Sequence, residues 1–230
     1  MNAQVMNGQV MNGQGTLAAH ATVGQLLRSD LAFVADWIAP GSTVLDLGCG
    51  DGALLAWLQE HKDCRCYGVE IDHDNLQACV RRGVAVVQQN LEEGLSMFED
   101  KSFDTVLQLQ SLQMLQHTEG SLREIARVGR QSIVTFPNFA FWRNRISLAR
   151  GRMPVTKALP YQWYDTPNLR FSTLADFADL ARGNGLEVLD CVALHEGRQV
   201  GWLPNLRGSL AVFRFGEQGG RGAAAVRGKD

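Results

Sequence analysis

Asp46 is followed by glycines at every second position, Gly48, Gly50 and Gly52. The apolar residues before Asp46 are typical of a buried parallel strand, which places the acid near the carboxyl end of that strand. Glycine lets the backbone turn sharply and approach a ligand closely. The segment therefore predicts a strand, a tight turn and a helix that hold a nucleotide-like cofactor, with contacts from Gly48, Cys49 and Gly50.

The spacing of these glycines separates two classes of cofactor. Dinucleotide-binding turns carry the spacing G-x-G-x-x-G, whereas this chain has G-x-G-x-G behind an acid. The Asp46 carboxylate would repel a diphosphate, but it suits a ligand with an amino group and hydroxyls, such as S-adenosylmethionine. The pattern resembles the first motif of class I S-adenosylmethionine-dependent methyltransferases. NAD binding and a tight turn without a ligand stay as alternatives.

Further cofactor contacts are expected where later strands end. Glu70 stands 24 residues after the first acid, near the offset at which an acid accepts hydrogen bonds from ribose hydroxyls. Ile71 would then face the adenine. In the family that the motif resembles, an acid after the third strand binds the adenine amine; here Asn90 and Leu91 stand, and an amide oxygen can also accept from that amine. The strand end Gln108-Leu109-Gln110 is expected to pass under the methionine part, mainly through its backbone groups.

The composition favours a soluble protein without a membrane or nucleic acid as partner. The 22 basic and 24 acidic residues nearly cancel, so no overall field attracts a polyanion. The sequence has no apolar run of membrane-spanning length and no signal peptide, which makes the cytoplasm the expected location. Five irregularly spaced cysteines predict reduced thiols. Cys64 and Cys66 with His61 lack the second half of a zinc site, so no metal is expected.

Strands and helices alternate along the chain, which predicts a doubly wound α/β fold with a mostly parallel, seven-stranded sheet. The methyltransferase resemblance implies that the last strand is antiparallel. An N-terminal repeat of Val-Met-Asn-Gly-Gln predicts disorder over residues 1–24, and the Gly- and Arg-rich end predicts a flexible tail over 217–230. A single domain is expected between them, at 25–216. After the first strand, the expected strands are 65–71, 84–89, 102–109, 132–136, 186–194 and 209–215. The main expected helices are 26–38, 53–60, 121–128 and 174–182, with a further helix that Asp72 caps and that runs through about residue 82.

A longer resemblance covers most of this domain, roughly residues 28–215. Residues 133–168, with shorter runs at 35–38 and 201–206, resemble the methionine biosynthesis protein MetW family. The resemblance implies a class I methyltransferase fold and a partnership with the homoserine O-acyltransferase MetX. Asn90 in place of the usual acid departs from the family and weakens the expected adenine recognition. The residues around Ser111 and the N-terminal repeat also depart from it.

The sequence contains no recognisable motif for binding a methyl acceptor. Gln110-Ser111-Leu112 stands where an amine-orienting Asn-Pro-Pro-Tyr motif would follow the fourth strand, and no Pro-Cys nucleophile is present. No catalytic residue can therefore be assigned. We expect a protein that binds S-adenosylmethionine or S-adenosylhomocysteine and acts with MetX. The alternative is a catalytic methyltransferase for a small molecule or a protein, with RNA a less favoured acceptor.

Two segments carry unusual side chains. The cluster from Tyr161 to Asp165 is aromatic and acidic, and it predicts a cover of the cofactor cleft that could be a lid, a partner-docking surface or a packed loop. Residues 139–152 interleave aromatic side chains with arginines. Because the total charge is near neutral, a helix with outward arginines is favoured over an RNA surface. The apolar stripe expected to be buried on that helix comprises Phe139, Trp142, Ile146 and Ala149.

Overall fold

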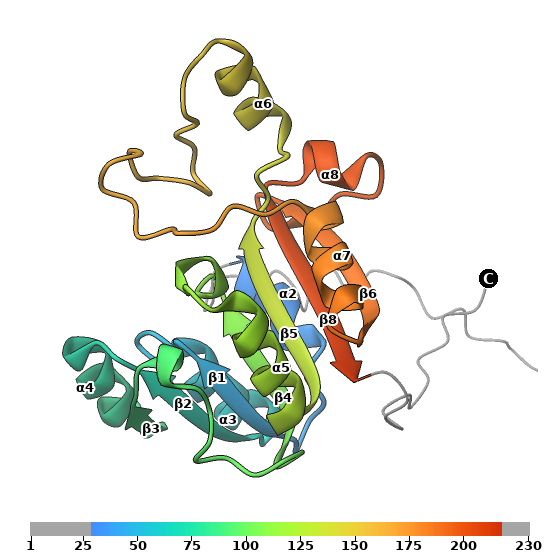
Figure 1. Cartoon of the computed structure of the whole chain (residues 1–230). Helices are drawn as coiled ribbons and strands as arrows, with labels where there is room; N and C mark the ends of the chain where they lie inside the picture. Colours follow the sequence, from blue (N-terminus) through green and yellow to red (C-terminus); the bar gives the residue numbers. More distant parts are fainter. Residues whose placement is uncertain (1–28, 218–230) are drawn as a thin grey trace, which may run out of the picture.

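The computed structural model describes residues 29–217, which form one mixed sheet with helices on both faces (Figure 1). The predicted disordered segment 1–24 and residues 218–230 of the predicted tail lie outside the described residues. The strand order is β3-β2-β1-β4-β5-β8-β6-β7, with the first five strands parallel. The strands are β1 (Thr43–Leu47), β2 (Arg65–Glu70), β3 (Ala85–Gln88), β4 (Phe103–Leu109), β5 (Gly129–Pro137), β6 (Leu186–His195), β7 (Arg198–Gln199) and β8 (Leu210–Glu217).

The antiparallel last strand is confirmed: β8 runs antiparallel to both β5 and β6 and lies between them. The sheet has eight strands where seven were predicted, because the two-residue β7 folds back onto the end of β6. Glu217, expected to begin the tail, is the last residue of β8 and pairs with Lys101 at 2.8 Å. The carboxyl end of the domain therefore extends one residue further than expected.

Two apolar clusters fill the two sides of the sheet. Leu45 and Leu47 join the cluster that also contains Leu122 and Phe177, whereas Val44, which precedes Leu45, joins the cluster that contains Val34 and Leu55. This alternation buries both faces, as a doubly wound sheet requires. Within residues 29–217, no helix has the length and apolarity that a membrane span needs. The helices are α2 (Ser29–Asp36), α3 (Ala53–Lys62), α4 (His73–Arg81), α5 (Thr118–Val128), α6 (Trp142–Ala149), α7 (Leu174–Gly183) and α8 (Pro204–Arg207), with short 3-10 turns η1 (Leu91–Glu93) and η2 (Leu112–Met114).

Helix starts follow the local sequence. Asp72 caps α4 by accepting a hydrogen bond from the Asn75 amide at 2.9 Å, as its place before the helix predicted. At α7, Thr173 and Asp176 form a reciprocal capping box. Such caps are worth about 1 kcal/mol each, because they satisfy amides that have no partner inside the helix. They fix where the loops at the sheet edge begin and end.

The segment between β5 and α7, residues 138–173, is named the insertion here. It carries α6 and projects beyond the carboxyl end of β5, away from β1, β2 and β3 (Figure 1). The expected burial of its apolar stripe is wrong: Trp142 and Ile146 are 41% and 39% exposed. Asn144 is buried instead, and its amide donates to the carbonyls of Asn138 and Phe139 at 3.2 Å. Because the helix is anchored by these polar contacts, its apolar side chains stay in solvent.

Candidate cofactor site

The glycine turn between β1 and α3 has the backbone that its sequence predicts. Gly48, Gly50 and Gly52 have positive φ angles of 79°, 57° and 73°, which side chains with a Cβ rarely adopt. The amides of Gly48 and Cys49 both donate to the carbonyl of Val69, at 2.8 and 3.2 Å. The turn is therefore fastened to β2 before α3 begins at Ala53.

Gly48 lies against the loop that follows β4. A Cβ at Gly48 would stand 3.1 Å from the Cβ of Ser111, which is tighter than ordinary van der Waals contact. Ser111 Oγ also donates to the carbonyl of Leu47 at 2.9 Å. The end of β4 thus closes onto the turn, and a ligand held by the turn would also lie next to this loop.

Asp46 lies near the carboxyl end of β1 and is only 3% exposed. Its Oδ1 has no hydrogen-bond partner among the described residues. Burial and, to a smaller extent, the nearby Glu70 carboxylate together raise the pKa of Asp46 from its ordinary value of 3.8 to about 7. A buried carboxyl oxygen without a partner is costly. A cationic or hydroxyl-bearing ligand would remove that cost.

Glu70 occupies the end of β2, where it is 8% exposed. Its Oε2 accepts from the Gly50 amide at 2.8 Å, and its Oε1 accepts from the amides of Ile71 and Asp72 at 2.7 and 3.0 Å. These three bonds hold the carboxylate over the turn. A carboxylate oxygen has about two acceptor directions, and Oε2 uses only one of them, so it can still accept a ligand hydroxyl.

The remaining predicted adenine contacts lie along the same edge of the sheet. Ile71 is 58% exposed, and its carbonyl accepts from the Gln88 amide at 3.2 Å, which links the loops after β2 and β3. Asn90 Oδ1 accepts from the Glu92 amide at 3.1 Å and so caps η1. Leu91 is partly buried against the core. The structure therefore brings these side chains to the edge that Glu70 occupies.

Gln108 differs from the other predicted residues because it is fully buried within β4, and neither of its side-chain polar atoms has a partner among the described residues. After this strand, Ser111 reaches the glycine turn. Gln110, which precedes it, has a positive φ of 55°, and its Nε2 donates to Asp30 Oδ2 at 2.9 Å. The sequence pattern pointed to the strand end through Gln110 but not to Ser111, because a contact 64 residues apart leaves no local pattern.

Cys49 packs below the turn against Cys79 of α4, with 3.8 Å between the sulfur atoms. Cys79 also donates to the Gly50 carbonyl at 3.2 Å. Burial raises the pKa of the Cys49 thiol, and the Asp46 carboxylate raises it further. The thiol therefore stays neutral at physiological pH, which disfavours a nucleophilic role for Cys49.

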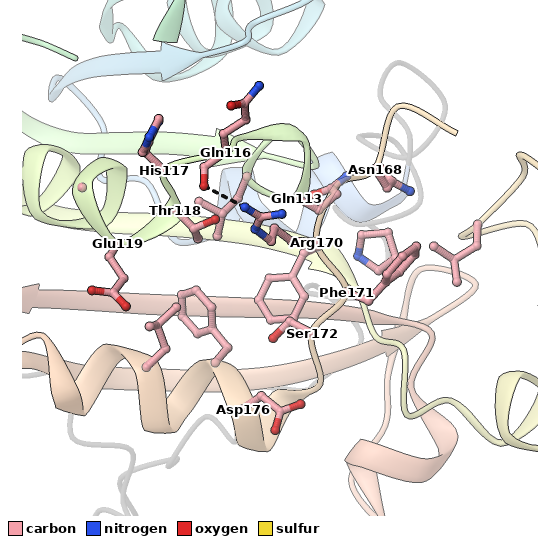
Figure 2. A pocket seen from close by; sticks show the side chains of 17 residues that line it. Gln113, Gln116, His117, Thr118, Glu119, Asn168, Arg170, Phe171, Ser172 and Asp176 are labelled. Carbon is pink, nitrogen blue, oxygen red and sulfur yellow. Dashed lines mark hydrogen bonds between the residues drawn. The ribbon is translucent and has the colours of Figure 1, made fainter. Parts of the chain in front are cut away.

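Two large cavities lie on the insertion side of the molecule. The first, named the polar cavity, has about 890 Å³ and lies under α6 at the ends of β4 and β6. Asp30 and Gln110 line it, together with Arg143, Lys157 and His195. The second, named the apolar cavity, has about 630 Å³ and lies between η2, α5 and α7 (Figure 2). The loop that contacts the glycine turn lies between the two cavities: Gln110, before Ser111, lines the polar cavity, and Leu112, after it, lines the apolar cavity.

The solved structures that resemble this chain in fold include methyltransferases. An S-adenosylmethionine-dependent methyltransferase from Thermotoga maritima superposes with a TM-score of 0.60 at 20% identity, covering 89% of this chain and 94% of that one. The magnesium protoporphyrin IX methyltransferase of Synechocystis, solved with bound S-adenosylhomocysteine, gives 0.57 at 19% identity, covering 93% and 90%. The chain therefore has the class I methyltransferase, Rossmann-like fold.

Sequence comparison identifies the protein family more closely than the fold does. A bifunctional methionine biosynthesis protein MetXA/MetW from Rhodopirellula baltica is 39% identical over 164 residues, which are 67% of this chain and 26% of that protein. A fatty-acid O-methyltransferase of Mycolicibacterium smegmatis is 32% identical over 93 residues, 38% of this chain and 33% of that enzyme. This chain thus spans only a minor part of either relative. The family model for methionine biosynthesis protein MetW matches residues 28–215. The chain belongs to the MetW family of methionine biosynthesis proteins.

Proposed function

We propose that this protein binds S-adenosylmethionine or S-adenosylhomocysteine at the glycine turn and acts with the homoserine O-acyltransferase MetX in methionine biosynthesis. The observation that carries the cofactor assignment is the pair of buried carboxylates, Asp46 and Glu70, beside a turn built for close approach. Two acids disfavour a diphosphate. They favour a ligand that offers hydroxyls, an ammonium group and a sulfonium.

The residues along the carboxyl edge of the sheet would each contact a different part of the ligand. Glu70 would accept from the ribose hydroxyls, while the backbone of Gly48 and Gly50 approaches the ligand from below. Ile71 would cover one face of the adenine, and Asn90 would accept from its amine. When bound, the cofactor supplies an activated methyl group on a sulfonium. Asp46 would oppose the positive charge of the ligand.

Isothermal titration calorimetry of the full chain tests this assignment. S-adenosylmethionine and S-adenosylhomocysteine are expected to bind, whereas NAD, with its diphosphate, is expected not to bind. Asp46→Ala is expected to weaken binding, and Asp74→Ala, on the exposed first turn of α4, serves as the matched control. No heat or thermal shift with millimolar S-adenosylmethionine, or equal binding of NAD, would overturn the cofactor assignment.

The insertion supports the partnership with MetX. Ten of the eighteen exposed large apolar side chains among the described residues belong to it, a density typical of a protein-binding surface. Trp163 and Tyr164 are 70% and 71% exposed, so the aromatic cluster is not the packed loop that was one of its predicted alternatives. The relative from Rhodopirellula baltica carries MetXA and MetW in one bifunctional chain. We place MetX on this surface.

Co-expression with MetX from the same organism tests the partnership. The acyltransferase is expected to lose activity without this protein and to regain it with the wild-type chain. The double variant Trp163→Ser with Tyr164→Ser should lose both co-purification and activation. Trp202→Ser, which removes a side chain of equal exposure outside the insertion, should lose neither. Full acyltransferase activity without this protein would refute the partnership.

Methyl transfer to a small molecule or a protein is the second candidate function. The polar cavity favours it, because this space opens beside Gln110 at the end of β4, next to the loop that contacts the turn. Release of S-adenosylhomocysteine in the presence of cell metabolites would support it. Loss of that release in the Asp46→Ala variant would show that the activity belongs to this chain.

A further inference from the structure

The apolar cavity has the size and lining of a small-molecule site. Its volume of about 630 Å³ falls within the range of ligand pockets, roughly 300 to 1,000 Å³. It opens between α5, α7 and the loop residues 168–172 of the insertion (Figure 2). The walls are mainly apolar and come from Leu112, Phe136, Leu159, Phe171, Phe177 and Leu180. Such walls suit the body of an organic molecule.

Two buried amides interrupt these apolar walls. Gln113 is 9% exposed, and its Nε2 donates to the Gln110 carbonyl at 2.7 Å, which leaves its Oε1 without a partner among the described residues. Asn168 is 8% exposed and also lines the cavity. The carbonyl of Gln113 accepts from the amides of Leu169 and Arg170, so the two stretches are tied together. A buried amide oxygen without a partner is costly, and a ligand N–H or O–H would satisfy it.

A cation stands beside these amides. Arg170 donates from Nη2 to the Gln116 carbonyl at 3.0 Å, a bond drawn in Figure 2, and from Nη1 to the Leu169 carbonyl at 3.2 Å. It forms no ion pair with residues 29–217. The acids at the rim are engaged elsewhere: Glu119 pairs with Arg123, and Asp176 caps α7. Because a guanidinium has five N–H donors, Arg170 can still bind a carboxylate.

We propose that the apolar cavity binds an organic acid with a large apolar body and a hydroxyl or amino group next to its carboxylate. The carboxylate lies at Arg170, the neighbouring donor bonds to Gln113 Oε1, and the apolar body lies among Phe136, Phe177 and Leu180. This site is separate from the glycine turn and needs no cofactor. Its test can therefore fail while S-adenosylmethionine binding succeeds, or the reverse.

Calorimetry with three ligands of one chain length tests each contact: 2-hydroxydecanoate, decanoate and decan-1-ol. Each polar group is expected to add about tenfold in affinity, the effect of roughly 1.4 kcal/mol. Arg170→Gln should remove the preference for decanoate over decan-1-ol, and Gln113→Leu should remove the preference for 2-hydroxydecanoate over decanoate. Arg198→Gln, an exposed arginine on β7, is the matched control and should change neither ratio.

A filled cavity provides the second test. Leu180→Trp on α7 should abolish binding of all three ligands, whereas Val80→Trp, on the exposed side of α4, should leave it intact. Circular dichroism melting checks that each variant folds, and Arg170 is exposed, so its variant tests the site even if Leu180→Trp does not fold. Equal affinity of the wild-type chain for the acid and the alcohol, or an unchanged ratio in Arg170→Gln, would overturn the proposal.

Discussion

Glu70 Oε2 and the amide of Gly50 are joined by a hydrogen bond of 2.8 Å that ties the end of β2 to the glycine turn after β1. The same carboxylate accepts a hydrogen bond from the amide of Asp72, and the side chain of Asp72 caps α4. One side chain thus connects the turn, the second strand and the next helix. Changes at this position therefore affect both the ligand edge and the local fold.

Glu70→Gln is expected to weaken S-adenosylmethionine binding at least tenfold and to lower the free energy of unfolding by about 1.5 to 3 kcal/mol. The reason is that hydrogen bonds to a charged acceptor are stronger than bonds to a neutral one, and the variant loses that charge. Calorimetry and urea denaturation measure the two effects. Glu93→Gln, an exposed acid in η1, is the control. An unchanged affinity in Glu70→Gln would exclude a ribose contact.

The pH dependence of stability should reveal Asp46. Its pKa is about 7 in the folded protein against 3.8 ordinarily, so between about pH 4 and pH 7 the folded chain binds a proton that the unfolded chain has lost. Stability from this group is therefore complete below pH 4 and falls by about 1.4 kcal/mol per pH unit until pH 7.

Comparison with Asp46→Asn isolates this contribution, because the variant cannot ionise. The difference in unfolding free energy between the wild type and Asp46→Asn should change steadily from pH 4 to pH 7 and stay constant above and below. Asp51 supplies the contrast, since Arg82 lowers its pKa and its stabilisation is lost only as the pH falls. A flat difference for Asp46→Asn would show that its pKa is not raised.

Gly52→Ala should destabilise the protein more than Gly83→Ala. Both positions have positive φ angles, 73° and 74°, so both variants carry a backbone cost of about 1 to 2 kcal/mol. A Cβ at Gly52 would also lie 2.8 Å from the Cys79 sulfur, whereas Gly83 has open space. Adding Cys79→Ala should recover the excess loss at Gly52 and nothing at Gly83, as measured by thermal melting. Equal losses at both glycines would contradict the close packing.

Gln108→Met should raise the free energy of unfolding by about 1 to 3 kcal/mol, because the variant replaces an unpartnered buried amide with an apolar chain of similar length. Gln131→Met is the matched control on the adjacent strand. Gln131 Nε2 donates to Thr105 Oγ1 at 2.9 Å, so its loss should destabilise. Urea denaturation compares the two variants. A large loss of stability in Gln108→Met would mean that the amide has a partner in solution.

The parts of the fold that local patterns encode were predictable. The glycines of the turn, the cap at Asp72 and the alternation of strands and helices each follow from neighbouring residues. The conformation of α6 was not predictable in this way. Its 3.6-residue apolar spacing indicated a buried face, but Asn144 takes the buried position because the carbonyls of Asn138 and Phe139 accept from it. A helix that leaves the sheet gains no apolar contact from its periodicity.

The residues of the candidate site also fall into two groups, those that the local sequence identifies and those that only the fold brings together. Asp46 and Glu70 stand next to the motifs that identify them, so the strand pattern was enough to place both. Ser111 reaches the turn only because β4 pairs with β1 and ends beside it. Gln113, Asn168 and Arg170 come together through contacts between η2 and the insertion. The positions of these residues in the sequence do not predict that they are in contact.

The place of β8 in the sheet has a consequence for synthesis on the ribosome. The last strand of the described residues lies between β5 and β6 and pairs with both. Until residues 210–217 emerge, β5 presents an unpaired edge, and such edges recruit other chains. The nascent protein therefore needs residues 210–217 before its sheet can close. A message truncated upstream of β8 would yield aggregating chains rather than a smaller domain.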